Sequence, residues 1–190
     1  MTSLRVVVAE DEAIIRLDLS EMLVEEGYEV VGQTGRGDEV LALVQLTKPD
    51  LVLMDVQMPG LDGISAARLI SDERLAAVVV LTAFSQRELV QQARDAGVMA
   101  YLVKPFHQAE LVAAIEVAVG RFAELVASAA QAASAADQLA TRKIIDRAKA
   151  RLQSIGRSEQ EAFAEIQRRA MDERTTMKAV AESILAERAT

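Results

Sequence analysis

Leu51-Val52-Leu53-Met54-Asp55 is an apolar run that ends in an acid, and the turn residues Pro59 and Gly60 follow it closely. A short, continuously apolar run bounded by turn residues is typical of a strand buried on both faces. A carboxylate that follows such a strand lies at the carboxyl edge of the sheet, where open α/β sheets carry their sites. Asp55 is therefore predicted to lie at the centre of a functional site.

Strand-like and helical patterns alternate along the first part of the chain. The apolar runs cover residues 4–9, 29–33, 51–54, 78–81 and 99–103. The helical patterns cover residues 13–26, 38–46, 63–72 and 86–95, with glycine or proline residues as stops. This alternation predicts an α/β fold with a parallel sheet and helices on both of its faces.

The composition excludes several classes of site. The 190 residues include no cysteine, so disulfides, thiolate metal ligands and thiol nucleophiles are excluded. No run of about 18 apolar residues suggests a membrane span, and residues 1–5 lack the apolar stretch of a signal peptide. We therefore expect a cytoplasmic protein that does not enter a membrane.

Charge is distributed unevenly along the chain. Residues 1–140 carry 21 acidic and 10 basic side chains, a net charge of −11, whereas residues 141–190 carry 8 acidic and 11 basic ones, a net charge of +3. An acidic body with a mildly basic tail predicts two domains with different partners. On charge alone, a polyanion partner for the tail and a solvated helical face both remain open.

Polar side chains follow four of the predicted strands and are expected to meet at one edge of the sheet. They are Glu10, Asp11, Asp55, Thr82 and Lys104. Three carboxylates packed together need a cation to stay ionised, and with no soft ligand available the predicted cation is Mg²⁺. Mg²⁺, a hydroxyl and an ammonium can together neutralise three phosphoryl oxygens. Asp55 is accordingly predicted to be a nucleophile that accepts a phosphoryl group.

An ordered set of motifs resembles the receiver domain of two-component response regulators over about residues 4–122. The motifs are Glu10-Asp11, Met54-Asp55, Met58-Pro59, Asp62-Gly63, Leu81-Thr82-Ala83 and Val103-Lys104-Pro105-Phe106. The resemblance implies a flavodoxin-like (βα)5 fold with the parallel strand order 2-1-3-4-5, and residues 1–122 are taken as the receiver domain. It also implies a phosphohistidine on a partner histidine kinase as the phosphoryl donor. The chain is then not an enzyme, apart from slow self-dephosphorylation.

The same resemblance implies roles for individual residues. Asp55 is the phosphoacceptor, Thr82 and Lys104 contact the phosphoryl group, and Tyr101 is the switch aromatic. The implied Mg²⁺ ligands are Asp11, Asp55, the backbone carbonyl of Gln57 and Glu10, which ligates directly or through water.

A heptad spacing of apolar or small residues continues beyond the predicted receiver. The seam consists of Leu111, Ile115, Ala118, Phe122, Leu125, Ala129, Ala132, Ala136 and Leu139. No Gly or Pro interrupts residues 121–153, which predicts one long helix whose connector part covers residues 123–138. Residues 111–119 are expected to cover the sheet, and the later seam is almost all alanine and buries little area. A helical spacer and a coiled-coil dimer stalk that strengthens on phosphorylation both remain open.

Residues 139–190 predict a small three-helix module. Its helices are expected over about residues 139–153, from a capping box at Ser158 to about residue 171, and from a cap at Thr175 or Thr176 to about residue 188. The predicted core consists of Ile145, Ala148, Leu152, Ala162, Phe163, Ile166, Ala170, Met171, Val180, Ala181 and Ile184. Phe163 is the single aromatic residue of this part, and its assignment to the core leaves no aromatic for stacking on bases.

This module resembles an ANTAR domain, a three-helix module that binds paired stem-loops in nascent RNA and prevents transcription termination. The motifs are Arg147-Ala148-Lys149, Glu161-Ala162-Phe163, Ala170-Met171 and Val180-Ala181. With the receiver, the chain is similar to the mycobacterial response regulators of phosphorylation-dependent antitermination. We therefore expect RNA stem-loops in nascent transcripts as partners, RNA polymerase as an indirect partner, and a homodimer that forms on phosphorylation. The residues expected to contact RNA are Arg142, Lys143, Lys149, Arg168, Arg174, Thr175, Thr176 and Lys178.

Two other functions are compatible with parts of this pattern. The tail of a receiver-controlled regulator can instead bind DNA or dock on a protein. A Mg²⁺-dependent phosphohydrolase is disfavoured, because such enzymes typically place an Asp-x-Asp pair after one strand and here Gln57 occupies the second position.

Overall fold

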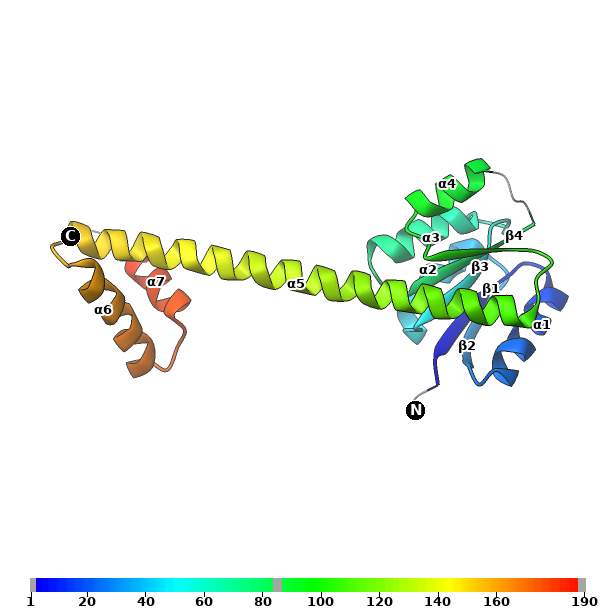
Figure 1. Ribbon diagram of the computed structural model, residues 1–190, viewed down its shortest axis with the longest axis horizontal. Coiled ribbons are helices and arrows are strands. Elements are labelled where there is room, and N and C mark those ends of the chain that lie inside the picture. Colours follow the sequence, from blue (N-terminus) through cyan, green and yellow to red (C-terminus); the bar gives the residue numbers. More distant parts are fainter. Residues whose placement is uncertain (1–2, 84–86, 188–190) are drawn as a thin grey trace. The chain divides into compact units, whose positions relative to one another are not determined.

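The computed structural model describes residues 3–83 and 87–187 (Figure 1). The chain divides into two compact units, Met1–Ala127 and Ser128–Thr190. The predicted helix start at Gln86 and the predicted helix end at Arg188 lie outside the described residues. Throughout the described ranges, no helix combines the length and the apolar character that a membrane span requires.

The first unit is built on a five-stranded parallel sheet. The strands are β1 (Arg5–Ala9), β2 (Glu29–Thr34), β3 (Leu51–Asp55), β4 (Ala77–Thr82) and β5 (Ala100–Val103). Their order in the sheet is β2-β1-β3-β4-β5, which confirms the predicted flavodoxin-like order. The central strand β3 is fully buried, as its unbroken apolar run requires, and it includes Asp55 as its last residue.

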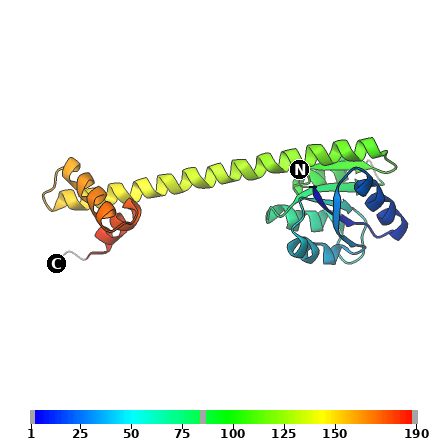
Figure 2. The ribbon, with the colours of Figure 1, turned by 90° about the horizontal axis from the view of Figure 1, so that it is seen from below.

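Helices cover both faces of the sheet. They are α1 (Ala13–Glu25), α2 (Gly37–Thr47), α3 (Gly63–Asp72), α4 (Arg87–Asp95) and the first part of α5 (Gln108–Ser154). Because side chains alternate along a strand, Val52 and Met54 pack with α2 and α3, whereas Leu51 and Leu53 pack with α1 and α5. Figure 2 shows the start of α5 on one side of the sheet and the blue-green helices α2 and α3 on the other.

Helix α5 runs without interruption for 47 residues, as the absence of Gly and Pro from residues 121–153 predicted. Within the first unit, Leu111, Ile115 and Ala118 are buried against the sheet, which confirms the expectation for residues 111–119. Further along the seam, Leu125 and Leu139 are exposed in the single chain.

The second unit packs the end of α5 against α6 (Glu159–Asp172) and α7 (Met177–Ala186). Its buried residues are Ala148, Leu152, Ala162, Ile166, Ala170, Val180, Ala181 and Ile184. The predicted capping box at Ser158 opens α6, and Thr176 caps α7 by accepting a hydrogen bond from the Ala179 amide. Both helices therefore begin where their capping residues predicted.

Two residues assigned to this core lie outside it. Phe163 is 45% exposed and Met171 is 72% exposed. The buried face of α6 follows the four-residue spacing of Ala162, Ile166 and Ala170. Phe163 and Met171 each come one residue after a member of this series, and a helix turns by about 100° per residue, so both side chains point away from the core.

Candidate functional site

The carboxyl ends of four strands meet at one edge of the sheet. Glu10 directly follows β1, Asp55 ends β3, Thr82 ends β4 and Lys104 directly follows β5. Parallel pairing aligns these ends, since Met54 lies opposite Ala9, Leu81 opposite Asp55, and Val103 opposite Thr82. The backbone register therefore brings together residues that are up to 94 positions apart in the chain.

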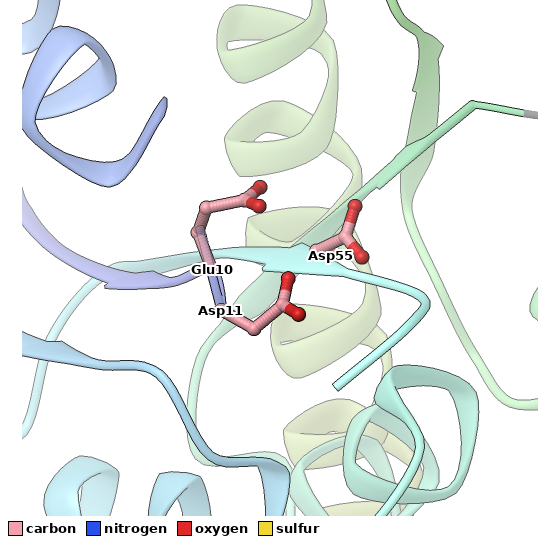
Figure 3. Close-up of side chains that lie close together, drawn as sticks. All are labelled: Glu10, Asp11 and Asp55. Atoms are coloured by element: carbon pink, nitrogen blue, oxygen red, sulfur yellow. The ribbon is translucent and has the colours of Figure 1, made fainter. Parts of the chain in front are cut away.

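Three carboxylates converge at this edge (Figure 3). Glu10, Asp11 and Asp55 each offer one oxygen, and these oxygens lie within 4.8 Å of one another. Glu10 and Asp55 are buried, whereas Asp11 is exposed. Together with Gln57, Thr82 and Lys104 they line a cavity of about 140 Å³.

The ammonium of Lys104 bridges two of the carboxylates. Its Nζ lies 2.6 Å from Glu10 Oε2 and 2.7 Å from Asp55 Oδ1. The other oxygen of Asp55, Oδ2, accepts a hydrogen bond of 2.7 Å from the backbone amide of Gln57. The peptide bond between Lys104 and Pro105 is cis. Lys104 and the Gln57 backbone amide together bind both oxygens of Asp55 and orient its carboxylate.

Burial and pairing shift two pKa values in this cluster. Burial raises the pKa of the Glu10 carboxyl above its ordinary value of 4.5, and the Asp55 carboxylate raises it further, against the opposing effect of Lys104. Burial alone lowers the pKa of Lys104, but its hydrogen bonds to Asp55 and Glu10 outweigh this and raise the pKa above 10.5. Lys104 is therefore a positively charged ammonium at neutral pH and can pair with the Asp55 carboxylate.

The donor set of the cavity fits a hard divalent cation. One ammonium faces three carboxylates, so the cluster has a charge of about −2 when all of them are ionised. The three carboxylates that converge here offer only oxygen atoms as ligands, the type that Mg²⁺ prefers. Asp11, Asp55, Glu10 and the carbonyl of Gln57 are the groups that would hold it.

Arg16 on α1 was missed by the sequence reasoning. Its Nη1 donates hydrogen bonds to the backbone carbonyl of Glu10 and, at 3.4 Å, to that of Asp11. The guanidinium thereby supports the loop that carries two of the three carboxylates. No sequence motif marks this residue, because the contact depends on how α1 packs beside the end of β1.

Tyr101 lies apart from the carboxylate cluster. This residue of β5 is 49% exposed and lines a separate cavity of about 290 Å³ with Arg94 and Arg121. Tyr101 therefore lies on an exposed edge of the sheet and is not a buried core residue. The structure thus brings Glu10, Asp11, Asp55, Gln57, Thr82 and Lys104 together and places Tyr101 elsewhere on the first unit.

The residues expected to contact RNA all lie in the second unit, and several already have protein partners. Lys149 pairs with Asp146 at 3.2 Å and Glu159 at 3.0 Å, and Lys178 pairs with Asp137 at 3.0 Å. Thr176 is engaged as the cap of α7. Exposed residues of the set are Arg142, Lys143, Arg168, Arg174, Thr175 and Thr176. Of this set, the structure places Arg142 and Lys149 around one cavity on α5, together with Phe163.

Two family models match the chain. The response regulator receiver domain matches residues 6–116, and the ANTAR domain matches residues 133–185. The chain is 59% identical over 182 residues to the transcriptional regulatory protein PdtaR of Mycobacterium tuberculosis, an alignment that covers 95% of this chain and 89% of the relative. It is 34% identical over 112 residues to the chemotaxis protein CheY of Thermotoga maritima, which covers 58% of this chain and 93% of the relative.

Solved receiver domains share the fold of the first unit. That of the response regulator NarL from Mycobacterium tuberculosis superposes with a TM-score of 0.61 at 29% identity, covering 63% of this chain and 98% of that one. The receiver domain of a sensor histidine kinase from Pseudomonas aeruginosa has a TM-score of 0.56 at 28% identity, covering 63% of this chain and 99% of that one. The latter structure has a magnesium ion coordinated in its active site cleft.

Proposed function

This chain belongs to the response regulators that combine a receiver domain with an ANTAR domain, and from this premise we propose that phosphorylation of Asp55 controls RNA binding by the ANTAR domain. A histidine kinase supplies the phosphoryl group, and the output is antitermination of transcription. The RNA partners are stem-loops in nascent transcripts, so RNA polymerase is an indirect partner and the cytoplasm is the site of action.

One observation carries the receiver half of this proposal. Asp55 is buried at the end of β3, with Lys104 Nζ 2.7 Å from one carboxylate oxygen and the Gln57 amide 2.7 Å from the other. The ammonium and the amide orient the nucleophile, and the Thr82 hydroxyl lines the same cavity, where it would contact the oxygens of a phosphoryl group on Asp55. Bound Mg²⁺ would supply the remaining positive charge that a phosphoryl group needs.

The RNA half rests on the charge and the domain match of the tail. Residues 141–190 have a net charge of +3, and the ANTAR match covers residues 133–185. Contacts from Arg142, Lys143, Arg168, Arg174 and Thr175 to phosphates are available without breaking any ion pair of the described residues. Lys149, Thr176 and Lys178 have protein partners, but each ammonium has three donors and the Thr176 hydroxyl only accepts in its cap, so each can also donate to RNA. Dimerisation through the exposed seam of α5 is the proposed link between phosphorylation and RNA affinity.

RNA capture by the full chain tests this function. With Mg²⁺ and beryllium fluoride present as a phosphoryl mimic, stem-loop RNA is expected to bind about tenfold more tightly than without them, a coupling of typical size. The affinity is expected to fall steeply with salt, because basic side chains displace counterions from phosphates. The chain with Asp55→Asn serves as the control and should keep the basal RNA affinity while losing the response. Preferential retention of duplex DNA over RNA in competition would instead favour a DNA-binding output.

Replacing Lys104 with Met is expected to strengthen Mg²⁺ binding by about tenfold, because it removes a cation that repels Mg²⁺ from the carboxylate cluster. The same replacement should slow the phosphorylation of Asp55, because the phosphoryl group loses a positively charged partner. Isothermal titration calorimetry with Mg²⁺ measures the first effect. Lys143→Met, an exposed lysine of the second unit, is the matched control and should leave Mg²⁺ affinity unchanged. Weaker Mg²⁺ binding by the Lys104 variant would contradict this electrostatic account.

A further inference from the structure

An exposed aromatic ring stands at the edge of a cavity in the second unit. Phe163 of α6 lines this cavity of about 560 Å³, and all of its other lining residues come from α5. The volume lies within the range of about 300–1,000 Å³ that is typical of small-molecule sites. An aromatic side chain that is 45% exposed on a small domain has not been used to build the domain core.

The α5 side of the cavity presents polar and charged groups on one helical face. Gln138, Arg142 and Lys149 are separated by four and seven residues, which places them along a single stripe, and Thr141 lies beside this stripe, three residues after Gln138. Arg142 has no hydrogen bond or ion pair with any described residue, so its guanidinium is available for a ligand. The acids Asp137 and Asp146 also line the cavity, and each pairs with a lysine, Asp137 with Lys178 and Asp146 with Lys149.

We propose that this cavity, which we call the Phe163 site, binds one unpaired RNA base stacked on the Phe163 ring, with its phosphate on Arg142. This inference rests on the proposed RNA-binding function and names the part of the RNA that is read. Every base has a face that can stack on an aromatic ring, and single-stranded loops present such faces to proteins. The amide of Gln138, the hydroxyl of Thr141 and the carboxylate of Asp146 line the same cavity and offer donors and acceptors for the polar edge of the base.

The charges around the ring favour a nucleotide over a second copy of the chain. The core of a helical dimer interface is apolar, and charged residues are depleted from the fully buried part of protein interfaces. Here the charged side chains that line the cavity with the ring are the cations Arg142 and Lys149 and the acids Asp137 and Asp146, and Ile145 is the one further apolar residue of the lining. An aromatic ring can stack on the base of a nucleotide while a neighbouring cation binds its phosphate.

Binding measurements with three variants of the full chain test the Phe163 site. The probes are a pool of RNA hairpins with a common stem and a randomised loop, and the same stem as an uninterrupted RNA duplex. Phe163→Leu is expected to weaken hairpin binding by about tenfold, the order of magnitude for loss of one stacked base, and to leave duplex binding unchanged. Phe163→Trp keeps a ring and should bind hairpins as the unsubstituted chain does. Met171→Ala, which removes another exposed apolar side chain of α6, should have no effect.

Ultraviolet crosslinking provides a direct second readout. Trypsin cleaves after Arg157 and Arg168, so residues 158–168 form one peptide in which Phe163 is the single aromatic residue. Irradiation of the hairpin complex is expected to attach a nucleotide to Phe163 in this peptide, and the duplex complex should give no such product.

The possible contrary results separate this inference from the proposed function. If Phe163→Leu binds hairpins as tightly as the unsubstituted chain, the Phe163 site is wrong while RNA binding stands. If the unsubstituted chain with its phosphoryl mimic binds neither probe, the proposed function falls and the inference falls with it. If Phe163→Leu lowers dimer formation in sedimentation experiments and RNA affinity does not change, a second copy occupies the site and the inference is overturned.

Discussion

Asp55→Asn is expected to reduce phosphorylation of the chain to background. The Asn side chain has no carboxylate oxygen to attack phosphorus, and its one carbonyl oxygen can replace only one of the two Asp55 oxygens, which accept hydrogen bonds from the Gln57 backbone amide and from Lys104. The variant therefore keeps one of these two hydrogen bonds and loses the nucleophile. Incubation with acetyl phosphate and Mg²⁺, followed by intact mass spectrometry, measures the effect without a cognate kinase.

Asp50→Asn supplies a matched control for this experiment. Asp50 immediately precedes β3, at the opposite end of the strand from Asp55, and its side chain accepts a hydrogen bond of 2.9 Å from the Arg5 amide. Asn can accept the same bond, so this variant should be phosphorylated to the same extent as the unsubstituted chain. Undiminished labelling of Asp55→Asn would show that the nucleophile lies elsewhere, and the account of the sheet-edge cluster would then be wrong.

The sheet and its carboxyl edge could be predicted from sequence because both depend on short-range patterns. Apolar runs such as residues 51–54 can be satisfied only by burial on both faces, and the helical patterns between them force parallel connections. Once the strands are parallel, Glu10, Asp55 and Lys104 must share an edge whatever the details of packing. The ion pairs of Lys104 with Glu10 and Asp55 agree with this geometry.

Features that depend on side-chain direction could not be predicted in the same way. Phe163 belongs to an apolar helical pattern, but a single step of about 100° separates it from the buried Ala162. The support that Arg16 gives to the Glu10 carbonyl depends on helix placement, and its spacing of six residues matches no helical face. Likewise, the pairing of Lys178 with Asp137 joins α7 to α5 across 41 residues, which composition alone cannot reveal.

Gly63→Ala is expected to destabilise the receiver unit by about 3 kcal/mol, the upper end of the range for overpacking. Gly63 is the first residue of α3, and its amide donates a hydrogen bond of 2.9 Å to the Val56 carbonyl. A Cβ at this position would lie 1.9 Å from the backbone oxygen of Asp55 and 3.1 Å from the Cα of Val56. These atoms are backbone, so no side-chain rotation relieves the clash, and α3 must move away from β3.

Tyrosine fluorescence isolates this effect in the full chain. The chain has two tyrosines and no tryptophan, and Tyr28 and Tyr101 both lie in the first unit. Urea unfolding followed by this signal therefore reports on the receiver alone. Gly120→Ala is the matched control, because Gly120 lies within α5 with nothing within 4 Å of an added Cβ. Replacing a helical Gly with Ala at such an open position should stabilise the chain by up to about 1 kcal/mol.

The Gly63→Ala variant should also be phosphorylated more slowly on Asp55 under conditions where it remains folded. Its added methyl group pushes directly on the backbone of Asp55, whose carboxylate is held between Lys104 and the Gln57 amide. A displacement of about 1 Å in a reacting group can cost on the order of a hundredfold in rate. A Gly63 variant that is less stable and yet phosphorylated at the normal rate would mean that α3 absorbs the whole displacement. The close contact between α3 and β3 would then serve stability alone, and the position of Asp55 would depend on its two hydrogen-bond partners.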